Sequence, residues 1–593
     1  MPFACALRCR VAFLALLGLS LPVGAQAQTT TTDPLAFETT RTGQAVALAP
    51  VPGRNGMVVS AQDIASRVGA DMLARGGNAV DAAAAVAYAL AVVYPAAGNI
   101  GGGGFMTLRT PDGHVSFVDF REHAPGAATP TMYQDAAGNV EAGASVTGWR
   151  AVAVPGTVAG IEQVHDRYGS LPRATVMAPA IALARDGFVL KQSDVDLLHT
   201  STETFAKDPY ARRIFLHPDG SPLMAGERLV QADLARTLER ISRHGARAFY
   251  SGPIAREIVR TSARRGGILT RRDLGAYHTR VMTPLACDYR GYHIDTAPPP
   301  SGGGIALCEM LNILSGYDMH ALGLHTAPGV QRMLEAMRHA YADRQALGDP
   351  DFVSNPVQHL NDPAYAREIR RYLPLDRALP SASLRAGAPG PEKEETTHYS
   401  IADRNGMAVA VTYTLNGWFG AGVVAGRTGI VMNDEMDDFS TRPGAPNMFG
   451  IVGSTANAIA PGKTPLSSMA PTIVSRAGQP VMVLGSPGGS RIPTIILSVL
   501  TGVVDYGLDV QQAVDLPRIH EQWQPDVVEV ERGALSPAVT RRLTREGYTI
   551  KEHAPWGLAE SILAGGPRIG QASTMRYYGG ADMRHQSGAA VGQ

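Results

Sequence analysis

TTHYSI, residues 396–401, opens a strand pattern after a stretch rich in proline, glycine and charge that runs from Asp376 to Glu395. A threonine in this place can become a new N-terminus if the chain cuts itself after the flexible linker. Its own free α-amine, whose pKa is about 8 when unperturbed, can then act as the base that activates the weakly nucleophilic hydroxyl. The sequence therefore predicts Thr396 as an N-terminal nucleophile.

A β-hairpin is predicted to follow the linker. Its strands are Thr396–Asp403 and Met407–Thr414, and Arg404-Asn405-Gly406 is the loop between them. Asp403 suits the first position of a type I turn, and Gly406 suits the left-handed position that closes the loop. The predicted nucleophile then lies at the end of a strand whose register is set by the turn.

The register of this hairpin brings a second hydroxyl to the nucleophile. If Asp403 pairs with Met407, Thr396 lies opposite Thr414, whose hydroxyl can orient the amine of the nucleophile. Asn416 follows two residues later on the same face. An ordinary buried hairpin, with threonines chosen for their strand propensity, explains the spacing as well. The spacing alone leaves these two interpretations open.

The composition indicates a large globular protein without a strong overall electrostatic field. The 593 residues include 53 basic and 53 acidic side chains, so the formal net charge is zero. A chain without excess positive charge does not attract nucleic acid or an anionic membrane through its overall field. The hydrophobic content of 45% and the charged content of 18% are typical of a globular chain with a large core.

The first 27 residues have the pattern of a secretory signal peptide. Arg8 and Arg10 form the charged region, and residues 11–23 form an apolar region that is too short to span a membrane. Ala25-Gln26-Ala27 matches a cleavage site, so the mature chain is expected to begin at Gln28. We therefore expect a periplasmic or secreted protein, and no other stretch is apolar enough to span a bilayer.

Two cysteines remain after removal of the signal peptide. Cys5 and Cys9 leave with it, whereas Cys287 and Cys308 stay in the mature chain. Two cysteines in an exported chain can pair, but the sequence does not show whether they lie close together. Their spacing matches no metal-binding motif, and we expect no metal or cofactor.

The clearest predicted helix covers Asn78–Tyr94, because Asn78 is a good N-cap and Pro95 ends it. It is apolar nearly all round and is therefore expected to be buried. Further helices are predicted at residues 174–186, 232–244, 328–345 and 491–503, and strands at 105–108, 115–120, 429–432, 471–475 and 481–484. Mixed strands and helices without repeats favour a layered α+β sandwich. Residues 579–593 are expected to be loose.

Two glycine-rich nucleotide motifs are only apparent. Residues 420–425 fit G-x-G-x-x-A, but the next segment is predicted as a strand and not as a helix, so we reject a dinucleotide site. Gly462-Lys463-Thr464 resembles the end of a P-loop, but the first glycine of that motif is replaced by Asn457. The sequence contains no G-x-S-x-G, H-E-x-x-H or C-x-x-C motif.

Charged side chains supply two weak signals of a functional site. The acidic group Glu435, Asp437 and Asp438 is either a solvated turn or a pocket for an ammonium group. Arg121 follows a predicted strand and could clamp a carboxylate, although taken alone it is better explained as part of a surface ion pair.

Hydroxyl groups and glycines supply two more weak signals of a functional site. Ser467-Ser468 lie in a rigid apolar loop, where they either form a turn or hydrogen-bond a carboxylate. Gly488-Gly489 precede a predicted helix, where they either make a tight turn or offer backbone N–H groups to an oxyanion.

Together these segments resemble the γ-glutamyltransferases (γ-glutamyltranspeptidases) of the N-terminal nucleophile hydrolase superfamily, over nearly the whole mature chain. The matching segments are residues 98–104, 119–122, 396–400, 411–416, 436–440, 465–469 and 485–490. The resemblance implies an α+β fold, a four-layer αββα sandwich formed jointly by two autoproteolytic subunits. The large subunit would cover residues 28–395, with the linker 376–395 at its end, and the small subunit residues 396–593.

The resemblance also implies a role for each site residue. Thr396 would be the nucleophile, Thr414 its hydroxyl partner, and Gly488 and Gly489 the oxyanion hole. The α-carboxylate of a γ-glutamyl group would be held by Arg121, Ser467 and Ser468, and its α-amine by Asn416, Glu435 and Asp438.

Two positions vary among members of this family. Glu435 stands where some members have glutamine, and either side chain can accept a hydrogen bond from an ammonium group. Phe449 stands in the expected lid, residues 441–450, where some bacterial members have tyrosine. Because phenylalanine cannot hydrogen-bond Asn416, looser closure of this lid is expected.

The expected reaction is acyl transfer from glutathione and related γ-glutamyl donors to water, amino acids or peptides. A first alternative is a glutaryl- or cephalosporin-type acylase of the same superfamily, and Asp438 argues against it because a glutaryl group has no amine. A second alternative is a non-catalytic periplasmic binder of γ-glutamyl compounds, which would not need a cleavable Thr396. The sequence leaves open the ratio of hydrolysis to transfer, the preferred acceptor and donor, and further association of the heterodimer.

Overall fold

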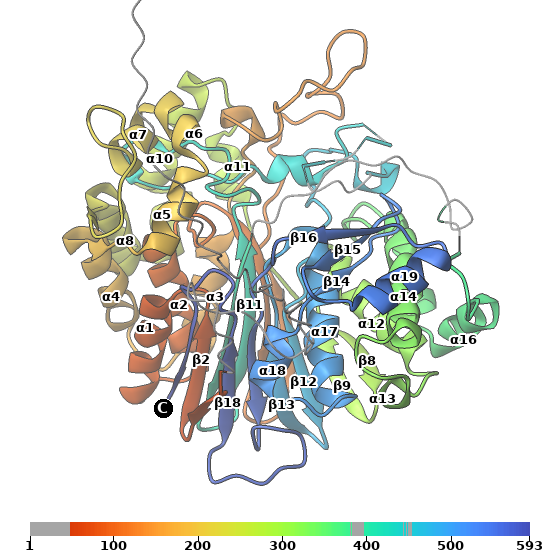
Figure 1. The fold of residues 1–593 in the computed structure, drawn as a ribbon. Helices are drawn as coiled ribbons and strands as arrows, with labels where there is room; N and C mark the ends of the chain where they lie inside the picture. Colours follow the sequence, from red (N-terminus) through yellow and green to blue (C-terminus); the bar gives the residue numbers. More distant parts are fainter. Residues whose placement is uncertain (1–47, 380, 382–395, 443, 446, 449–452) are drawn as a thin grey trace, which may run out of the picture. The chain divides into compact units, whose positions relative to one another are not determined.

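Figure 1 shows the computed structural model of the chain, which describes residues 48–379, 381, 396–442, 444–445, 447–448 and 453–593. Three predicted features lie wholly or partly outside the described residues: the signal peptide, most of the linker with Glu395, and the lid residue Phe449.

In the described part of the chain, two seven-stranded sheets form the centre of the fold, and neighbouring strands in both are antiparallel. The first sheet has the order β19 (Ala589–Gly592), β2 (Gly56–Ser60), β10 (Thr397–Asp403), β11 (Ala408–Thr414), β3 (Gly103–Arg109), β4 (Val115–Asp119) and β7 (Arg280–Met282). The second has the order β1 (Val51–Gly53), β18 (Tyr577–Ala581), β17 (Glu560–Ala564), β13 (Gln479–Leu484), β12 (Thr472–Arg476), β9 (Tyr292–Thr296) and β8 (Leu285–Tyr289).

The two sheets pack face to face. Buried side chains of the first sheet, such as Val59 and Ala410, form one cluster with Ile473 and Val483 of the second sheet. The alternation of side chains along a strand turns the intervening residues, such as Val411, toward the helices on the outer face.

Helices cover the outer face of each sheet (Figure 1). On the first sheet they include α1 (Asp63–Ala74), α2 (Ala79–Val93) and α3 (Thr157–Tyr168), at the left of the figure. On the second sheet they include α12 (Gly303–Leu314), α14 (Ala327–Asp343) and α17 (Ile492–Val504), at the right. The predicted four-layer αββα sandwich is therefore confirmed.

The other elements surround these layers. The remaining helices are α4 (Arg173–Asp186), α5 (Gln192–His199), α6 (Thr202–Lys207), α7 (Pro209–Phe215), α8 (Ala232–His244), α9 (Ala246–Tyr250), α10 (Pro253–Arg264), α11 (Arg271–Ala276), α13 (Met319–Leu322), α15 (Val357–Leu360), α16 (Pro363–Tyr372), α18 (Val510–Asp515) and α19 (Pro537–Arg545). Two small sheets contain β14 (Ile519–His520), β15 (Val528–Glu531) and β16 (Ile550–His553), and β5 (Phe188–Val189) with β6 (Arg228–Leu229). No helix in the described ranges is long and apolar enough to cross a membrane.

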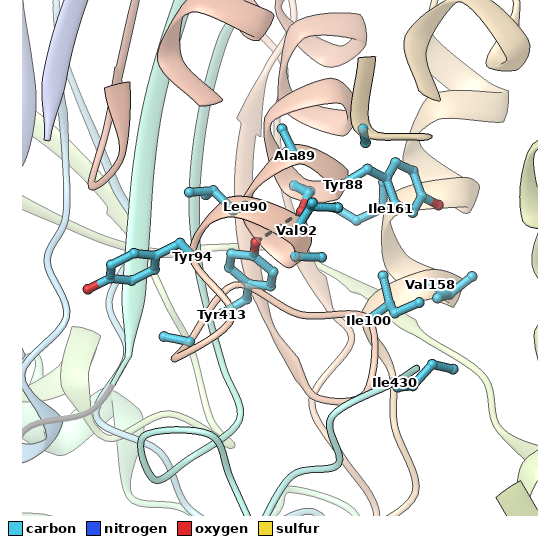
Figure 2. Close-up of a cluster of buried hydrophobic side chains, with 14 of the residues drawn as sticks. Tyr88, Ala89, Leu90, Val92, Tyr94, Ile100, Val158, Ile161, Tyr413 and Ile430 are labelled. Atoms are coloured by element: carbon cyan, nitrogen blue, oxygen red, sulfur yellow. Dashed lines mark hydrogen bonds between the residues drawn. The ribbon is translucent and has the colours of Figure 1, made fainter. Parts of the chain in front are cut away.

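Helix α2 supports the strand that carries part of the predicted site. Asn78 caps the helix in a reciprocal capping box with Asp81, and every residue of the helix is buried, as predicted. Figure 2 shows Tyr413 of β11 pointing at this helix, where its hydroxyl donates a hydrogen bond of 3.2 Å to the carbonyl of Ala87. The end of β11, and with it Thr414, is thereby tied to a rigid buried element.

The predicted hairpin register is confirmed. Strands β10 and β11 pair from Thr397 opposite Tyr413 to Ala402 opposite Ala408, and Asp403 donates its backbone N–H to the carbonyl of Met407 at 3.0 Å. Gly406 closes the loop with a φ of 84°, in the left-handed region that glycine adopts at no steric cost.

Two predictions of local structure were wrong. Residues 429–432 make only an isolated bridge, Val424 to Val431, because Gly429 turns the chain with a φ of 72° against the backbone of α8. The C-terminal residues 579–593 are not loose but include the end of β18 and all of β19, which pairs with β2. Backbone pairing along an open sheet edge holds these Ala- and Gly-rich residues, so they need no apolar pattern of their own.

The question of cysteine pairing is answered by the structure. Cys287 on β8 and Cys308 on α12 form a disulfide with a Cα–Cα distance of 5.9 Å. The bridge ties a helix of the outer layer to the sheet beneath it.

Candidate active site

A pocket with an empty volume of about 630 Å³ opens where the central hairpin ends. Every predicted site residue except Gly488 lines it: Arg121, Thr396, Thr414, Asn416, Glu435, Asp438, Ser467, Ser468 and Gly489. These residues come from several separate segments of the chain, so the fold brings the predicted site together. Gly488 directly precedes the lining residue Gly489.

The end of the pocket that contains the predicted nucleophile is built on the hairpin. Thr396 directly precedes β10, and Thr414 ends β11. The Thr414 hydroxyl accepts a hydrogen bond of 2.9 Å from the backbone N–H of Asn416, whose φ of 75° turns the chain sharply after the strand. Directly before the neighbouring strand β3, an added Cβ at Gly102 would lie 1.9 Å from the Thr414 carbonyl oxygen, so only glycine fits there.

Arg121 is a buried residue and not part of a surface ion pair. Its Nη1 lies 2.6 Å from Oε1 of Glu435, and its Nη2 pairs with Asp438. Its Nε donates to the carbonyl of Pro465 at 3.0 Å, so the guanidinium is held by two segments of the chain. The sequence alone favoured a surface pair because it cannot show that this strand end points into the pocket.

The acidic group divides into one side chain that faces away and two that face the pocket. Asp437 accepts hydrogen bonds from Ser145 Oγ at 2.6 Å and from Met448 N at 2.8 Å, and it does not line the pocket. Burial raises the pKa values of Glu435 and Asp438, and Arg121 opposes that effect in both. These two carboxylates therefore form the acidic wall of the pocket.

Glu122 lies behind this wall as a further buried carboxyl group. Burial raises its pKa well above the ordinary value, and the charge of Glu435 raises it further. Both of its carboxyl oxygens lack a hydrogen-bond partner in the described structure. Burial and the neighbouring charge of Glu435 therefore favour the neutral form of Glu122.

The two serines offer oriented hydroxyl groups. Ser467 Oγ accepts a hydrogen bond of 3.0 Å from the backbone N–H of Met469, and Ser468 Oγ accepts one of 3.1 Å from Nη2 of Arg344. Since each oxygen accepts a hydrogen bond from the protein, its O–H group is left to donate to an anion in the pocket. Sequence reasoning missed Arg344, and no motif in its segment marks it.

The glycine turn precedes helix α17. Gly488 and Gly489 have φ values of 138° and 53°, a region in which other residues are strained. A short 3₁₀ turn, Gly489–Arg491, leads from them into the helix. The turn therefore places glycine backbone beside the pocket, at the partly positive end of a helix.

His398 is close to Thr396 in sequence but is not one of the pocket residues. Its ring lies between the sheets, with Nδ1 2.8 Å from Thr412 Oγ1 and Nε2 3.0 Å from Ser400 Oγ. Burial lowers its pKa to about 3, so the ring is neutral. Its partners indicate a structural role.

Asn447 is a further polar side chain of the pocket, one that the sequence did not indicate. Asn447 donates from Nδ2 to Asp438 Oδ1 at 3.2 Å, and the Asn416 amide donates to the Asp434 carbonyl at 3.2 Å and to Met448 Sδ at 3.6 Å. Two described residues of the expected lid, Asn447 and Met448, thus contact Asp438 and Asn416, whereas Phe449 lies outside the described residues.

Comparisons with known proteins identify the family of the chain. The family model of gamma-glutamyltranspeptidase matches residues 65–592. The glutathione hydrolase proenzyme of Pseudomonas sp. (strain A14) is 52% identical over 551 residues, covering 92% of this chain and 96% of that protein. The glutathione hydrolase proenzyme of Escherichia coli (strain K12) is 47% identical over 519 residues, covering 87% and 89%.

The solved structures include a related acylase. The crystal structure of cephalosporin acylase from Bacillus halodurans matches with a TM-score of 0.80 at 28% identity, covering 93% of this chain and 98% of that chain. The resemblance deduced from the sequence motifs is thus confirmed by the family model, the relatives and the fold. The chain belongs to the gamma-glutamyltranspeptidase family and is an enzyme of the N-terminal nucleophile hydrolase type.

Proposed function

We propose that the chain transfers the γ-glutamyl group of glutathione and related donors to water or to the amine of an amino acid or peptide. The observation that carries this proposal is the composition of the pocket. A threonine at the predicted cleavage point faces the same pocket as a guanidinium paired with two carboxylates, Glu435 and Asp438. Opposite charges beside a nucleophile suit a donor that has a carboxylate and an ammonium on one carbon.

The active form is proposed to arise by cleavage between Glu395 and Thr396. The products are the large chain, residues 28–395, and the small chain, residues 396–593, which together form a heterodimer. The names of the two proenzyme relatives support a precursor. Export to the periplasm or the medium is proposed from the signal-peptide pattern of residues 1–27.

The proposed reaction has two acyl-transfer steps. In the first, the Thr396 hydroxyl gives its proton to the α-amine and attacks the γ-carbonyl of the donor, while N–H groups of Gly488 and Gly489 stabilise the oxyanion. The leaving amine takes up a proton as its bond to the carbonyl breaks, and a γ-glutamyl ester of Thr396 remains. In the second, water or an acceptor amine attacks the ester and returns the proton to Thr396 as its oxygen leaves.

Donor recognition follows from the same pocket. Arg121 with the Ser467 and Ser468 hydroxyls is proposed to hold the α-carboxylate. Asn416, Glu435 and Asp438 are proposed to hold the α-amine.

A glutaryl- or cephalosporin-type acylase is the second candidate, and the solved acylase structure favours keeping it. A glutaryl group, however, brings no ammonium group to pair with Glu435 and Asp438. A non-catalytic binder would remain one polypeptide on a denaturing gel, whereas the proposed enzyme gives two.

The first experiment measures turnover of a chromogenic γ-glutamyl anilide with and without a dipeptide acceptor. We expect release of the aniline in both cases, with faster release if the acceptor competes well with water for the acyl-enzyme. A glutaryl anilide is the matched control, since it lacks only the α-amine. Faster turnover of the glutaryl donor would favour the acylase, and no turnover of either by purified protein would contradict both enzymes.

Replacing Thr414 with valine is expected to slow cleavage or turnover while the chain still folds. Valine suits a strand, but it removes the hydroxyl that lies opposite the predicted nucleophile and accepts from Asn416. Loss of one orienting hydrogen bond costs about 1–3 kcal/mol, or roughly 5- to 150-fold in rate. The measurements are the cleavage half-life and kcat of the cleaved enzyme. Thr414→Ser keeps a hydroxyl, so its cleavage half-life and kcat should both be close to those of the wild type. Wild-type values in the valine variant would show that Thr414 is only a strand residue.

A further inference from the structure

Arg344 is a buried guanidinium in the wall of the pocket, directly after helix α14. It is 6% exposed, and besides Ser468 Oγ its Nη2 reaches the carbonyl oxygen of Ser467 at 3.3 Å. Its aliphatic part packs on Gly302, where an added Cβ would lie 3.0 Å from Arg344 Cγ. The side chain is therefore fixed against the serine loop.

No carboxylate of the described residues pairs with Arg344. Its Nε is buried without a hydrogen-bond partner, whereas Arg121 is paired with both Glu435 and Asp438. Arginine keeps its proton inside proteins, so Arg344 brings to the pocket a positive charge that no contacting carboxylate neutralises and that only the longer-range attraction of Asp438 offsets. A buried charge without a contacting counterion is costly, and an anionic group bound nearby would lower that cost.

We propose that Arg344 strengthens the selection of donors with an α-carboxylate, acting through the Ser468 hydroxyl and through its own positive charge. This inference rests on the proposed function, in which Ser467 and Ser468 hold that carboxylate. Because Arg344 donates to Ser468 Oγ, it aims the serine proton at the ligand. Arg344 is thus a positioning residue that acts through its neighbour.

The balance of charges in the pocket wall predicts which donor should gain when Arg344 is removed. The pocket wall carries two guanidiniums, Arg121 and Arg344, and two carboxylates, Glu435 and Asp438. Equal numbers of opposite charges suit a zwitterionic donor. Without Arg344 the wall has one cation against two carboxylates, so a donor with an ammonium group and no carboxylate gains relative to the zwitterion.

The experiment compares two anilide donors that differ only in the α-carboxylate, the γ-glutamyl and the γ-aminobutanoyl anilide. In Arg344→Gln we expect kcat/KM for the γ-glutamyl donor to fall by at least about tenfold, mainly through KM, and that for the γ-aminobutanoyl donor to stay or rise. Arg344→Lys, which keeps the charge, should recover part of the loss. If the γ-aminobutanoyl anilide turns over too slowly, the inhibition constants of L-glutamate and of γ-aminobutanoate as competitive inhibitors give the preference for the α-carboxylate instead.

Arg332 offers a matched control. It lies on α14, is 7% exposed, forms no ion pair among the described side chains, and does not line the pocket. Arg332→Gln therefore removes a similar buried arginine and should keep the wild-type ratio of kcat/KM for the γ-glutamyl donor to kcat/KM for the γ-aminobutanoyl donor. An Arg344→Gln enzyme with the wild-type ratio, or with equal losses for both compounds, would overturn the inference. A wild-type enzyme that fails to use the γ-glutamyl anilide would instead overturn the proposed function.

Discussion

Replacing Thr396 with alanine is expected to leave the chain as one uncut and inactive polypeptide. Alanine has no hydroxyl, so neither the attack that cuts the chain nor the attack on a donor can take place. The wild-type protein should give two bands on a denaturing gel, and N-terminal sequencing of the smaller piece should read Thr-Thr-His-Tyr. Any other start in active enzyme would refute the assignment of Thr396.

The neighbouring threonine provides the control for this experiment. Thr397 is fully buried on β10, and its hydroxyl has no hydrogen-bond partner among the described residues. Thr397→Ala therefore removes the same atoms one position later and should still be cut and active. Thr396→Ser keeps a hydroxyl and should be cut as well, so an uncut serine variant would point to a cause other than loss of the nucleophile.

The parts of the fold that were predictable are those specified by nearby residues. The α2 helix has its cap, its apolar body and its stop within one segment, and the hairpin has a turn that sets its register. Strand β19 and the segment 429–432 depend on partners far along the chain. The edge of β2 and the backbone of α8 decide their structure, and their own sequences carry no matching signal.

The same distinction separates the site residues that were found from those that were missed. Thr396 and Thr414 follow from the linker and the hairpin register, which are local features. The roles of Arg121 and Asp438 came from the resemblance, because no spacing shows that two side chains 317 residues apart pair with each other. Arg344 reads as an ordinary helix end, and only its contact with Ser468, 124 residues further on, distinguishes it.

Removing either member of the Arg121–Asp438 ion pair is expected to lower kcat/KM for a γ-glutamyl donor by at least about tenfold. Loss of one partner of a desolvated charged contact costs ~2–5 kcal/mol, part of which is the penalty for the charge that remains. The two variants should differ in selectivity. Asp438→Ala loses a partner of the α-amine, so the γ-glutamyl donor should lose its advantage over a glutaryl donor. Arg121→Ala should weaken both donors, because both have the carboxylate.

Arg109 serves as the control for a buried arginine that lies outside the pocket. It ends β3 and donates to the carbonyl of Gly478 at 2.6 Å, so Arg109→Ala should affect stability without changing the donor ratio. Wild-type kinetics in Arg121→Ala or Asp438→Ala would place donor binding elsewhere.

The ion pair explains why Arg121→Ala should have the larger effect of the two. Arg121 neutralises Glu435 and Asp438 together, and burial already raises the pKa of each carboxyl group. Without the guanidinium both pKa values should rise further, and protonated carboxyl groups no longer attract an ammonium group. One substitution thus removes the partner of the α-carboxylate and weakens the partners of the α-amine. Asp438→Ala leaves Arg121 paired with Glu435, so the partner of the α-carboxylate is kept. Equal losses in the two variants would show that the carboxylates keep their charge without Arg121.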